Sequence, residues 1–584
     1  MSSFDASFVI DAFHRLLPIL LVLVGAVGAF HFLRTLCLPR PLPGIPYNKY
    51  AVKKICGDMD DMYAAEGGRR RWVWSQPGKH GTVLCQAFLG PFRRSTVIVS
   101  DYDTAVDICS RHREFDRGGR NKECVGITAP NFHFTMETRD PRFKEHRKML
   151  RGLMSPQFLD EMAAPRIHRT ARYLVQLWRM KAAKAQGNAF SASHDLYLAT
   201  LDMISSVAFD MDEAKSSLKS SIHQLSHESG IFRPDTKTTE FAAPPLSPEV
   251  EALLDIPDMI SAAQGSPFPS LAQMLALFRN PKHLRCFWRR RSLLVRQTNI
   301  RLARPENSPP QCALDKLLQR EKNAADEAGR DPDFYSPAIR DEARYLLAGH
   351  DTTATVLAWW LKHMIRHQDV QARLREALWE ACPLARSESR LPAMSEILAL
   401  RVPYLDAVME ETLRCAQTAT LIVRQATCDT LISGYRIPKN TGIIICLAGP
   451  SITEPSIEHS EEAKAAAGIG GRPEVPAWPN DGIATYNPER WLKKEPDSSG
   501  HVRDVFDPKA GPNLAFSIGP RQCFGKKQAL LQLKITTTLL IWGFKFTKVK
   551  SPLHSNESDR LNTDEIKESL VNRPEHCYVT AEIL

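Results

Sequence analysis

A cysteine near the end of the chain lies among residues that suit thiol chemistry. Cys523 occupies the middle of AFSIGPRQCFGKK, with Arg521 and Gly519 before it and Gly525 after it. Such a thiol can be a buried hydrophobe, half of a disulfide, a nucleophile or a metal ligand. The glycines permit tight turns and the close approach of a flat ligand. The apolar segment from Lys526 onward predicts a helix, whose N-terminal dipole favours a thiolate just ahead of it.

The other cysteines weaken two of these alternatives. The chain has 13 cysteines at irregular spacings, and no Cys-x-x-Cys pair occurs among them. A structural zinc site of the usual kind is therefore not indicated, and the chain is neither short nor cysteine-dense, as a disulfide scaffold would be. We expect mostly reduced thiols in a cytosol-facing protein, in which the sequon at Asn556 does not meet the glycosylation machinery.

Two further groups of residues carry charge or a hydroxyl inside predicted helices. Glu411 and Arg414 are three residues apart in YLDAVMEETLRCA, so their charges can pair, although a solvated surface pair is the default reading. The apolar helix predicted over Ala343–Leu361 is interrupted by GHDTT. Thr352 can bond back to a carbonyl one turn earlier and bend this helix. Taken alone, an ordinary amphipathic helix explains that segment equally well.

The cysteine stretch resembles the haem-ligand loop of the cytochrome P-450 family, the haem-thiolate monooxygenases. Phe516, Gly519, Arg521, Cys523 and Gly525 fit the pattern Phe-x-x-Gly-x-Arg-x-Cys-x-Gly. The resemblance implies that Cys523 is the axial ligand of the iron in haem b (iron protoporphyrin IX). It also implies that the other four residues bind the cofactor, with Arg521 on a haem propionate.

The remaining motifs follow in the order of that family. The resemblance implies a structural lock made by Glu411, Arg414 and Arg490, the last in YNPERWL. It implies that Asp351 and Thr352 form the acid–alcohol pair that delivers protons to iron-bound oxygen. The family often has a His-Pro pair after the second lock residue, whereas this chain has CAQTAT there.

Two more arginines match family positions that hold haem propionates. Arg147, in DPRFKEHRKML, corresponds to the arginine of a Trp-x-x-x-Arg pattern, but Phe143 stands in place of the tryptophan. Arg424, ten residues after Arg414, resembles another propionate partner. The family docks an acidic reductase on the face that carries such residues, and basic side chains there would steer the encounter. Those side chains are Lys144, Lys148, Arg151, Lys526 and Lys527.

The substrate would contact apolar residues from three segments. The resemblance points to the loop ITAPNFHF, to the start of the GHDTT helix and to the strand after the lock helix. The residues implied are Phe132, Phe134, Ala348, Thr420, Leu421 and Ile422. They suggest a lipophilic substrate, although each of them suits an ordinary core equally well.

The N-terminal segment is a membrane signal. Leu16–Leu33 is an uncharged run of 18 residues, which as a helix spans roughly 27 Å and just crosses a thin bilayer. A cleaved signal peptide is the alternative, but the run is long for one and acidic residues precede it. Arginines and lysines follow it, which places the body in the cytosol. We expect an anchor and proline-rich hinge over 1–46 (helix about 16–33) and a catalytic domain over 47–584.

The overall composition agrees with a large globular body. The chain has 584 residues, 43% of them hydrophobic and 24% charged, with a net charge of +10 (76 basic minus 66 acidic). No motif for nucleic acid accompanies the basic excess. Helical periodicity dominates after residue 101, and polar stretches near 226–257 and 450–484 predict surface loops. We expect a mainly α protein with small β-sheets (α+β), a single helical domain behind one transmembrane helix.

The resemblance implies a haem-thiolate monooxygenase that inserts one atom of O2 into a lipophilic small molecule. The hinge GIPYN and the overall length resemble those of filamentous-fungal members of the family, which implies a role in secondary metabolism. Electrons would come from NADPH through an NADPH-cytochrome reductase, with cytochrome b5 as an optional second donor. We expect a single-pass protein of the endoplasmic reticulum, in contact with membrane lipid. The alternatives are a haem-thiolate isomerase or dehydratase that needs no reductase, and a non-catalytic haem sensor.

Overall fold

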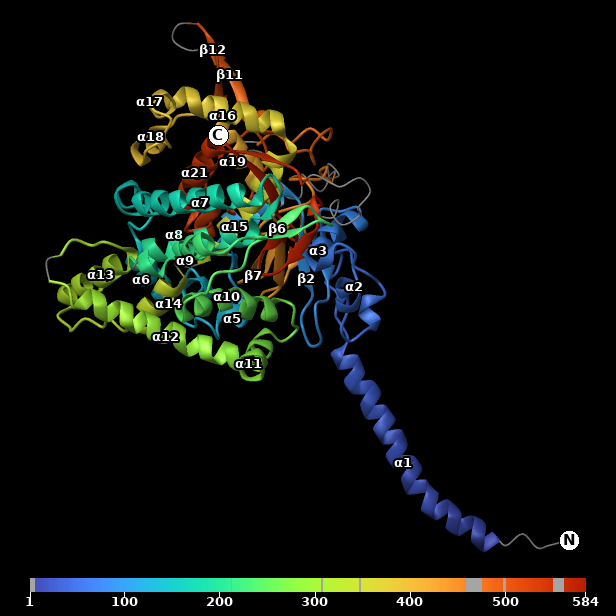
Figure 1. Cartoon of the computed structure of the whole chain (residues 1–584). Helices are drawn as coiled ribbons and strands as arrows, with labels where there is room; N and C mark the ends of the chain where they lie inside the picture. The colour runs from blue at the N-terminus through green and yellow to red at the C-terminus, as the bar shows by residue number, and fades with distance from the viewer. Residues whose placement is uncertain are drawn as a thin grey trace.

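The N-terminal helix stands apart from the rest of the protein. The computed structural model describes residues 6–211, 213–305, 308–345, 348–457, 475–496, 500–549 and 561–584. Helix α1 (Ala6–Cys37) contains the predicted 16–33 segment, extends it at both ends, and projects away from the body (Figure 1). Its stretch Leu20–Cys37 has a mean hydropathy of 1.9 and is entirely unburied, so it is long and apolar enough to cross a membrane.

The hinge after α1 joins the body through one buried side chain. The Gln86 side chain accepts from Leu42 N (2.8 Å) and donates to the carbonyls of Leu42 (2.9 Å) and Ile45 (2.8 Å). Ile45 is buried in the core, and Tyr47 forms a β-bridge with Gln86. The end of the proline-rich hinge is thus part of the folded body.

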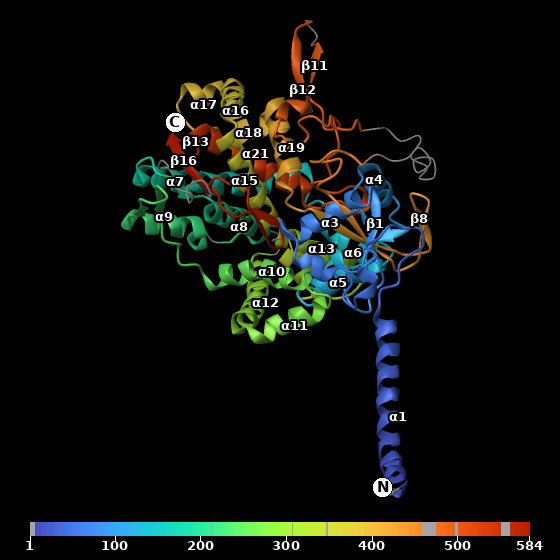
Figure 2. The same ribbon diagram turned by 90° about the vertical axis from the view of Figure 1, so that its right-hand side faces the viewer.

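Helices form most of the body and its main core. Their apolar faces meet where α15 crosses α8 and α19, and where α7 packs on α21 (Figures 1 and 2). The helices that position the site are α4 (Tyr102–Ser110), α6 (Pro141–Leu150), α7 (Ala164–Ala185), α8 (Ser193–Phe209), α10 (Pro248–Gln264), α11 (Pro269–Arg279), α12 (Pro281–Leu302), α14 (Pro337–Tyr345), α15 (Gly349–Arg366), α19 (Pro403–Ala416) and α21 (Lys526–Gly543).

The largest sheet of the described residues lies beside this helical core. Its strand order is β1 (Leu84–Ala87), β2 (Thr96–Val99), β10 (Gly442–Cys446), β7 (Leu421–Ala426), β3 (Phe115–Asp116). Only the β2–β10 pair is parallel. Alternate residues of a strand face opposite sides, so Val97 and Val99 enter one apolar cluster and Ile98 another. The sheet is buried on both faces.

Smaller sheets lie around the helical body, and the β11–β12 pair projects from it (Figures 1 and 2). A sheet of order β13 (Phe544–Thr547), β16 (Tyr578–Ile583), β4 (Phe190–Ser191) carries the C-terminus. Two-stranded pairs join β5 (Ile231–Arg233) to β6 (Thr238–Glu240), β8 (Thr430–Ile432) to β9 (Tyr435–Ile437), β11 (Leu492–Pro496) to β12 (Val502–Phe506), and β14 (Ile566–Glu568) to β15 (Asn572–Pro574). The expectation of a mainly helical protein with small sheets is confirmed.

One predicted loop is wrong over much of its length. The polar stretch 226–257 contains the β5–β6 hairpin and, from Pro248, the first half of α10. Ser247 caps this helix by accepting from Val250 N, and Pro248 occupies its first turn. The segment has the usual start signals of a helix, and Val250 and Leu253 bury its inner face. Of the second stretch, 458–474 lies outside the described residues.

Candidate active site

The Cys523 loop is a tight turn held against α4. Cys523 N donates to Phe516 O (2.9 Å), and Gln522 N donates to Gly519 O (3.0 Å). Gly519 has φ +73°, and a Cβ there would come within 2.4 Å of Cys109 O. Any side chain at this position would collide with the α4 backbone, so glycine is required for the approach.

The Cys523 thiol is exposed and lies just ahead of α21. Desolvation raises the pKa of Cys523 above its ordinary value, while the backbone N–H groups of Gly525 and Lys526 pull the pKa down. The charges of Arg117 and Lys526 act in the same direction as those N–H groups. The environment therefore supplies hydrogen-bond donors and cations that stabilise a thiolate. A positively charged ligand, such as a metal ion, would stabilise the thiolate further.

Arginines gather beside this loop with little negative charge to balance them. Burial lowers the pKa of Arg117 well below its usual range, and the neighbouring Arg424 and Arg521 lower it further. The Arg117 Nε is buried without a hydrogen-bond partner in the described residues. Burial likewise lowers the pKa of Arg424, which is 2% exposed. Arg117 was not among the predicted site residues. The local sequence signal for it is the Phe-Asp-Arg-Gly-Gly run at 115–119, in which a charged pair precedes two glycines.

Arg521 has several polar protein partners within this cluster. Its guanidinium pairs with Asp116 (2.9 Å) and donates to Thr138 Oγ1 (2.9 Å) and to the Met136 carbonyl. Phe143, which replaces the family's tryptophan, packs its ring 4.1 Å from the Arg521 guanidinium carbon. The Arg147 guanidinium carbon lies 5.0 Å from the Phe524 ring, next to Cys523. The predicted arginines thus converge on one region.

The excess of guanidinium groups fits an anionic cofactor. Among the described residues that shift the pKa values of Arg117 and Arg521, Asp116 is the shared carboxylate. A ligand with two carboxylates beside an exposed thiol would accept a hydrogen bond from the buried Arg117 Nε and balance the positive charge of the neighbouring arginines. The residues present therefore suit a haem with its two propionates.

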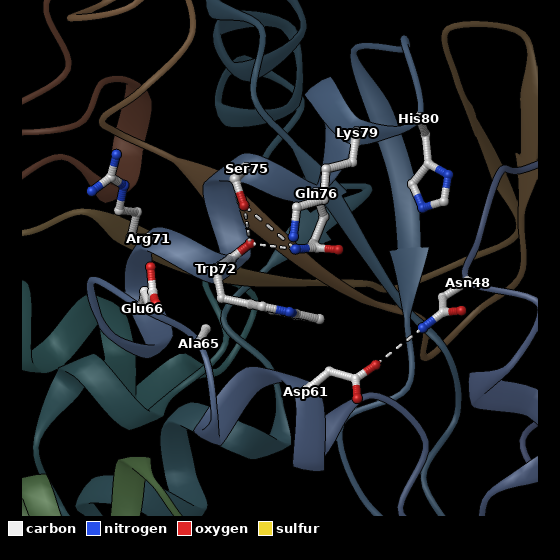
Figure 3. Close-up of a pocket in the computed structure, with 10 residues that line it drawn as sticks. All are labelled: Asn48, Asp61, Ala65, Glu66, Arg71, Trp72, Ser75, Gln76, Lys79 and His80. Atoms are coloured by element: carbon white, nitrogen blue, oxygen red, sulfur yellow. Dashed lines mark hydrogen bonds between the residues drawn. The ribbon is translucent and has the colours of Figure 1, made fainter.

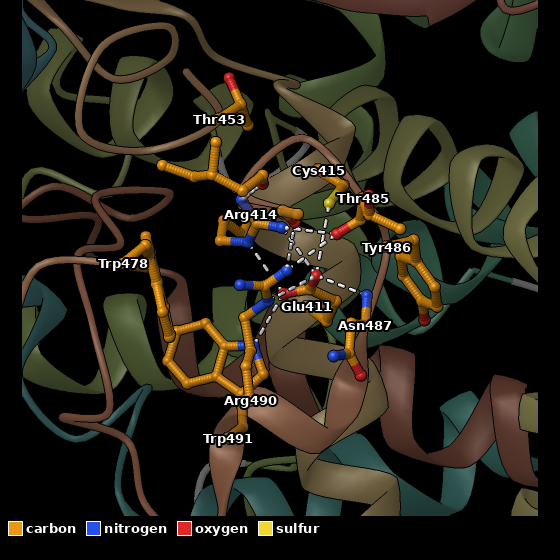
Figure 4. Close-up of polar contacts among 12 residues, drawn as sticks. Glu411, Arg414, Cys415, Thr453, Trp478, Thr485, Tyr486, Asn487, Arg490 and Trp491 are labelled. Atoms are coloured by element: carbon orange, nitrogen blue, oxygen red, sulfur yellow. Dashed lines mark hydrogen bonds and ion pairs between the residues drawn. The ribbon is translucent and has the colours of Figure 1, made fainter. Parts of the chain in front are cut away.

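Glu411, Arg414 and Arg490 meet in a largely buried network, in which the side chains of Glu411 and Arg414 are 0% exposed and that of Arg490 is 10% exposed (Figure 4). The Glu411 carboxylate accepts from Arg414 Nη2 (2.7 Å), Arg414 Nε (2.8 Å) and Arg490 Nε (3.1 Å). Trp491 Nε1 (2.9 Å) and Asn487 N (2.8 Å) donate to the same group. Arg414 also donates to carbonyls around residues 452 and 483–485. The network ties α19 to the chain leading to the Cys523 loop.

Asp351 and Thr352 begin α15 but face different surroundings. Asp351 is 2% exposed, and its Oδ1 lies 2.9 Å from Arg573 Nη2 on β15. Burial raises the pKa of Asp351, and Arg573 opposes that rise. Thr352 is exposed. Gly349, expected inside a long helix, is the first residue of α15, and 346–347 lie outside the described residues.

Tyr197 and His350 extend the surroundings of Asp351. The Arg573 guanidinium carbon lies 4.8 Å from the Tyr197 ring, and Tyr197 Oη is 3.2 Å from His350 Nε2. Arg573 is placed by its neighbour Asn572, whose carbonyl accepts from Trp359 Nε1 on α15 (2.9 Å). Tyr197 and Arg573 lie far from Asp351 in the chain, so the sequence around Asp351 does not predict them.

The predicted substrate residues fall into two environments. Phe132 and Phe134 stack, with ring centroids 5.9 Å apart, and the Arg117 guanidinium lies 3.4 Å from the Phe134 ring. Leu421 and Ile422 are half-buried on β7, whereas Thr420 is buried. Ala348 is exposed at the start of α15. The aromatic pair is therefore the part of the set that the structure brings beside the arginine cluster.

The cavity of about 620 Å³ shown in Figure 3 lies elsewhere. It is lined by α3 (Gly68–Lys79), by Asp61 of α2 (Met59–Tyr63) and by Asn48, whose Nδ2 donates to Asp61. No residue predicted for catalysis or cofactor binding lines it. This cavity adjoins the hinge rather than the Cys523 loop.

Comparisons with known proteins identify the family. A family model described as Cytochrome P450 matches residues 79–451 and 479–571. The chain is 31% identical over 581 residues to the cytochrome P450 monooxygenase TRI13 of Fusarium sporotrichioides, covering 95% of this chain and 97% of that protein. It is 32% identical over 551 residues to the cytochrome P450 monooxygenase xilC of Penicillium rubens, covering 93% and 94%.

A solved structure shares the fold. The crystal structure of the cytochrome P450DA heme domain superimposes with a TM-score of 0.65 at 18% identity, covering 94% of this chain and 98% of that one. The family match and the two fungal relatives extend over nearly the whole body. The chain therefore belongs to the cytochrome P450 family and is a haem-dependent monooxygenase.

Proposed function

We propose that Cys523 is the axial thiolate of a haem b whose propionates are held by Arg117, Arg147, Arg424 and Arg521. The observation that carries this proposal is the group of guanidiniums beside an exposed thiol, in which Arg117, Arg424 and Arg521 share the carboxylate of Asp116. Gly519 brings the loop against α4, and the peptide N–H groups of Gly525 and Lys526 stabilise the sulfur charge.

The haem, when bound, supplies activation of O2 for insertion of one oxygen atom into a C–H bond. The chain supplies the ligand, the pocket and the protons. Asp351 suits proton transfer because burial raises its pKa above the ordinary value of an aspartate. Thr352 follows Asp351 in the chain and has an exposed hydroxyl, which would relay protons from Asp351 to the site of O2 binding. This pair favours a monooxygenase over a haem isomerase or a sensor.

A carbon monoxide spectrum of the reduced protein tests this proposal. We expect a strongly red-shifted Soret band, which Cys523→Ala loses because alanine has no thiolate to bind the iron. Cys428→Ala is the matched control, since Cys428 is also an exposed free cysteine, and it should keep the band. A retained band in Cys523→Ala would remove the ligand assignment.

The electrons are proposed to come from NADPH through an NADPH-cytochrome reductase, with cytochrome b5 as an optional second donor. The basic residues Lys144, Lys148, Arg151, Lys526 and Lys527 are all exposed. Lys148 approaches Glu327 at 3.8 Å, but both side chains are well exposed and the pair is weak in water. An exposed basic face accelerates encounter with an acidic partner, so reduction should slow as ionic strength rises.

The substrate is proposed to be a lipophilic small molecule of fungal secondary metabolism, reached from the membrane. The aromatic pair Phe132 and Phe134 supplies an apolar wall beside the arginine cluster. Large apolar side chains are also exposed on α11 and its flanks, on the side of the body from which α1 leaves in both views (Figures 1 and 2). They include Phe268, Leu271, Met274, Leu275, Phe278 and Trp288.

We propose that residues 1–46 anchor the catalytic domain, 47–584, to the endoplasmic reticulum, with α1 crossing the bilayer once. Arginines and lysines from Arg34 to Lys54 follow the apolar segment, which favours a cytosolic body. The apolar face of α11 would meet the lipid surface beside the anchor. Removal of 1–37, which takes away α1 but keeps the contacts of Leu42 and Ile45 with Gln86, should release the protein from microsomes only in part, because α11 remains.

A further inference from the structure

A buried glutamate on α14 joins three elements around the aromatic pair. The Glu342 carboxylate is 1% exposed. It accepts from the backbone N–H of His133 (2.8 Å), from His133 Nδ1 (2.8 Å) and from His146 Nδ1 on α6 (2.7 Å). His133 lies between Phe132 and Phe134 in the chain and is the first residue of the short helix η2 (His133–Thr135). One carboxylate thus holds a loop, α6 and α14 together.

The neighbouring residue on α14 holds the same loop. Asp341 Oδ2 accepts from the backbone N–H of Asn131 (2.9 Å), and its Oδ1 lies 3.6 Å from Arg340. Burial by itself raises the pKa of Glu342, but the hydrogen bonds and charges of His133 and His146 hold the net pKa below its ordinary value. Glu342 therefore remains charged, and a buried charge of this kind binds its donors firmly.

The loop depends on these polar contacts because it has little core of its own. Phe132 and Phe134 pack on a small satellite cluster of Cys124, Val125 and Ala263, separate from the main helical core. A satellite cluster of this size contributes few apolar contacts. The position of the aromatic pair is therefore set largely by the bonds from α14.

His133 also reaches the cysteine loop. Its ring lies 4.7 Å from the Phe132 ring and 6.4 Å from the Phe524 ring, centroid to centroid. The His133 carbonyl accepts from Arg521 Nη1 (3.5 Å). The imidazole held by Glu342 is thus placed between the proposed substrate wall and the proposed haem-ligand loop.

We propose that Glu342 is a positioning residue that, through His133, fixes the Phe132–Phe134 wall relative to Cys523 and so selects large apolar substrates. The proposal rests on the proposed function, since it takes the aromatic pair as part of the substrate site. A small ligand that reaches the haem without touching the wall should not depend on Glu342. A large ligand that packs against the wall should.

Two azole probes separate these cases in the haem-loaded protein. Imidazole is small and clotrimazole is large, and each shifts the Soret band when its nitrogen binds the iron. In Glu342→Ala we expect the Kd of clotrimazole to rise about tenfold or more, because a buried group with several partners is lost. The Kd of imidazole and the carbon monoxide band should stay unchanged. Amide hydrogen exchange should rise most over residues 127–136, with a smaller rise in α6 around His146.

Two milder variants guard against a failure of Glu342→Ala to fold. Glu342→Gln keeps an acceptor for the His133 N–H and should restore part of the clotrimazole affinity. His133→Ala keeps the backbone bond but removes the imidazole, and should weaken clotrimazole selectively. The matched control is Asp195→Asn, a buried carboxylate on α8 that pairs with Lys181 (2.7 Å) and Trp178 (3.0 Å), away from the loop. It should leave both Kd values unchanged.

Either of two results would overturn the proposal. One is an unchanged Kd for clotrimazole in all three variants. The other is an equal loss of both azoles, which would make Glu342 a residue of general stability. A wild-type protein without the red-shifted carbon monoxide band would instead refute the haem-thiolate assignment, so the two failures are distinguishable.

Discussion

Two buried carboxylates in this protein face arginines in very different ways. Glu411 accepts from both Arg414 and Arg490 and also from Trp491 and a backbone N–H. Asp351 has one ion pair, to Arg573, and neither of its oxygens makes an aligned hydrogen bond within the described residues. The first group is saturated with donors, whereas the second has spare acceptor capacity.

The difference in donors separates a structural role from a chemical one. A carboxylate with a full set of donors stays ionised and rigid, and removing it leaves buried cations unpaired. A buried carboxylate with few donors has a raised pKa and can exchange a proton, as a catalytic acid requires. Substitutions at Glu411, and at Asp351 and its neighbours, test this difference.

The largest effect is expected at the saturated carboxylate. Glu411→Gln should lower the free energy of unfolding by about 3–5 kcal/mol, because Arg414 and Arg490 lose their counter-charge while remaining buried. Chemical denaturation monitored by circular dichroism measures the loss. Glu388→Gln, which breaks an exposed pair with Arg390, should cost no more than about 1 kcal/mol. Equal costs in the two variants would contradict the contrast.

Asp351→Asn should reverse that pattern, with a large loss of activity and no loss of stability. Product formation should fall about 10²-fold, since the proton donor is gone. The raised pKa means that ionised Asp351 costs stability at neutral pH, so the variant should be as stable as the wild type or more stable there. This advantage should fade as acid protonates Asp351. Strong destabilisation at neutral pH would assign Asp351 to the fold.

Thr352→Ala tests the second half of the proton path with a smaller change. Product formed per NADPH consumed should fall about tenfold, because one hydrogen-bonding group is removed from the route. NADPH consumption itself should persist, with peroxide as the product. Thr353→Ala is the neighbouring control, as Thr353 is buried and its hydroxyl faces Gln532 (3.4 Å). Unchanged coupling in Thr352→Ala would remove it from the path.

Arg573→Gln should give the smallest effect, with a distinctive pH dependence. Arg573 lowers the pKa of Asp351, so its loss raises that pKa further and costs about 1 kcal/mol of stability when Asp351 is ionised, Arg573 being 31% exposed. The cost should vanish at acidic pH, where Asp351 is protonated with or without Arg573. Thermal unfolding across pH measures this. A pH-independent cost would mean that Arg573 acts through packing on Tyr197.

Local spacing explains what the sequence could predict. Glu411 and Arg414 sit on one helix face three residues apart, so their contact follows from helix geometry. The residues of the Cys523 loop follow one another in the sequence, and its glycines indicate a turn. Helix α10 was not predicted because the polar composition of 226–257 indicates a surface loop, although Ser247 and Pro248 within that stretch are start signals of a helix.

Long-range partners explain what the sequence could not predict. Arg117 follows the edge strand β3, and Arg573 lies on β15 near the end of the chain. Both lie far in the sequence from the residues that they meet. The same holds for Glu342, whose two histidines lie about 200 residues earlier in the chain. A charged residue becomes recognisable only when the fold supplies its partner.

The short link held by Gln86 bears on how the protein would sit in a bilayer. Because the Gln86 amide fixes Leu42 and Ile45, only the few residues between Cys37 and Leu42 are left as slack between α1 and the body. A tether so short would permit little swivelling, unlike a long flexible linker. The orientation of the body relative to the bilayer would therefore follow the tilt of α1, and the same side of the body would always face the lipid.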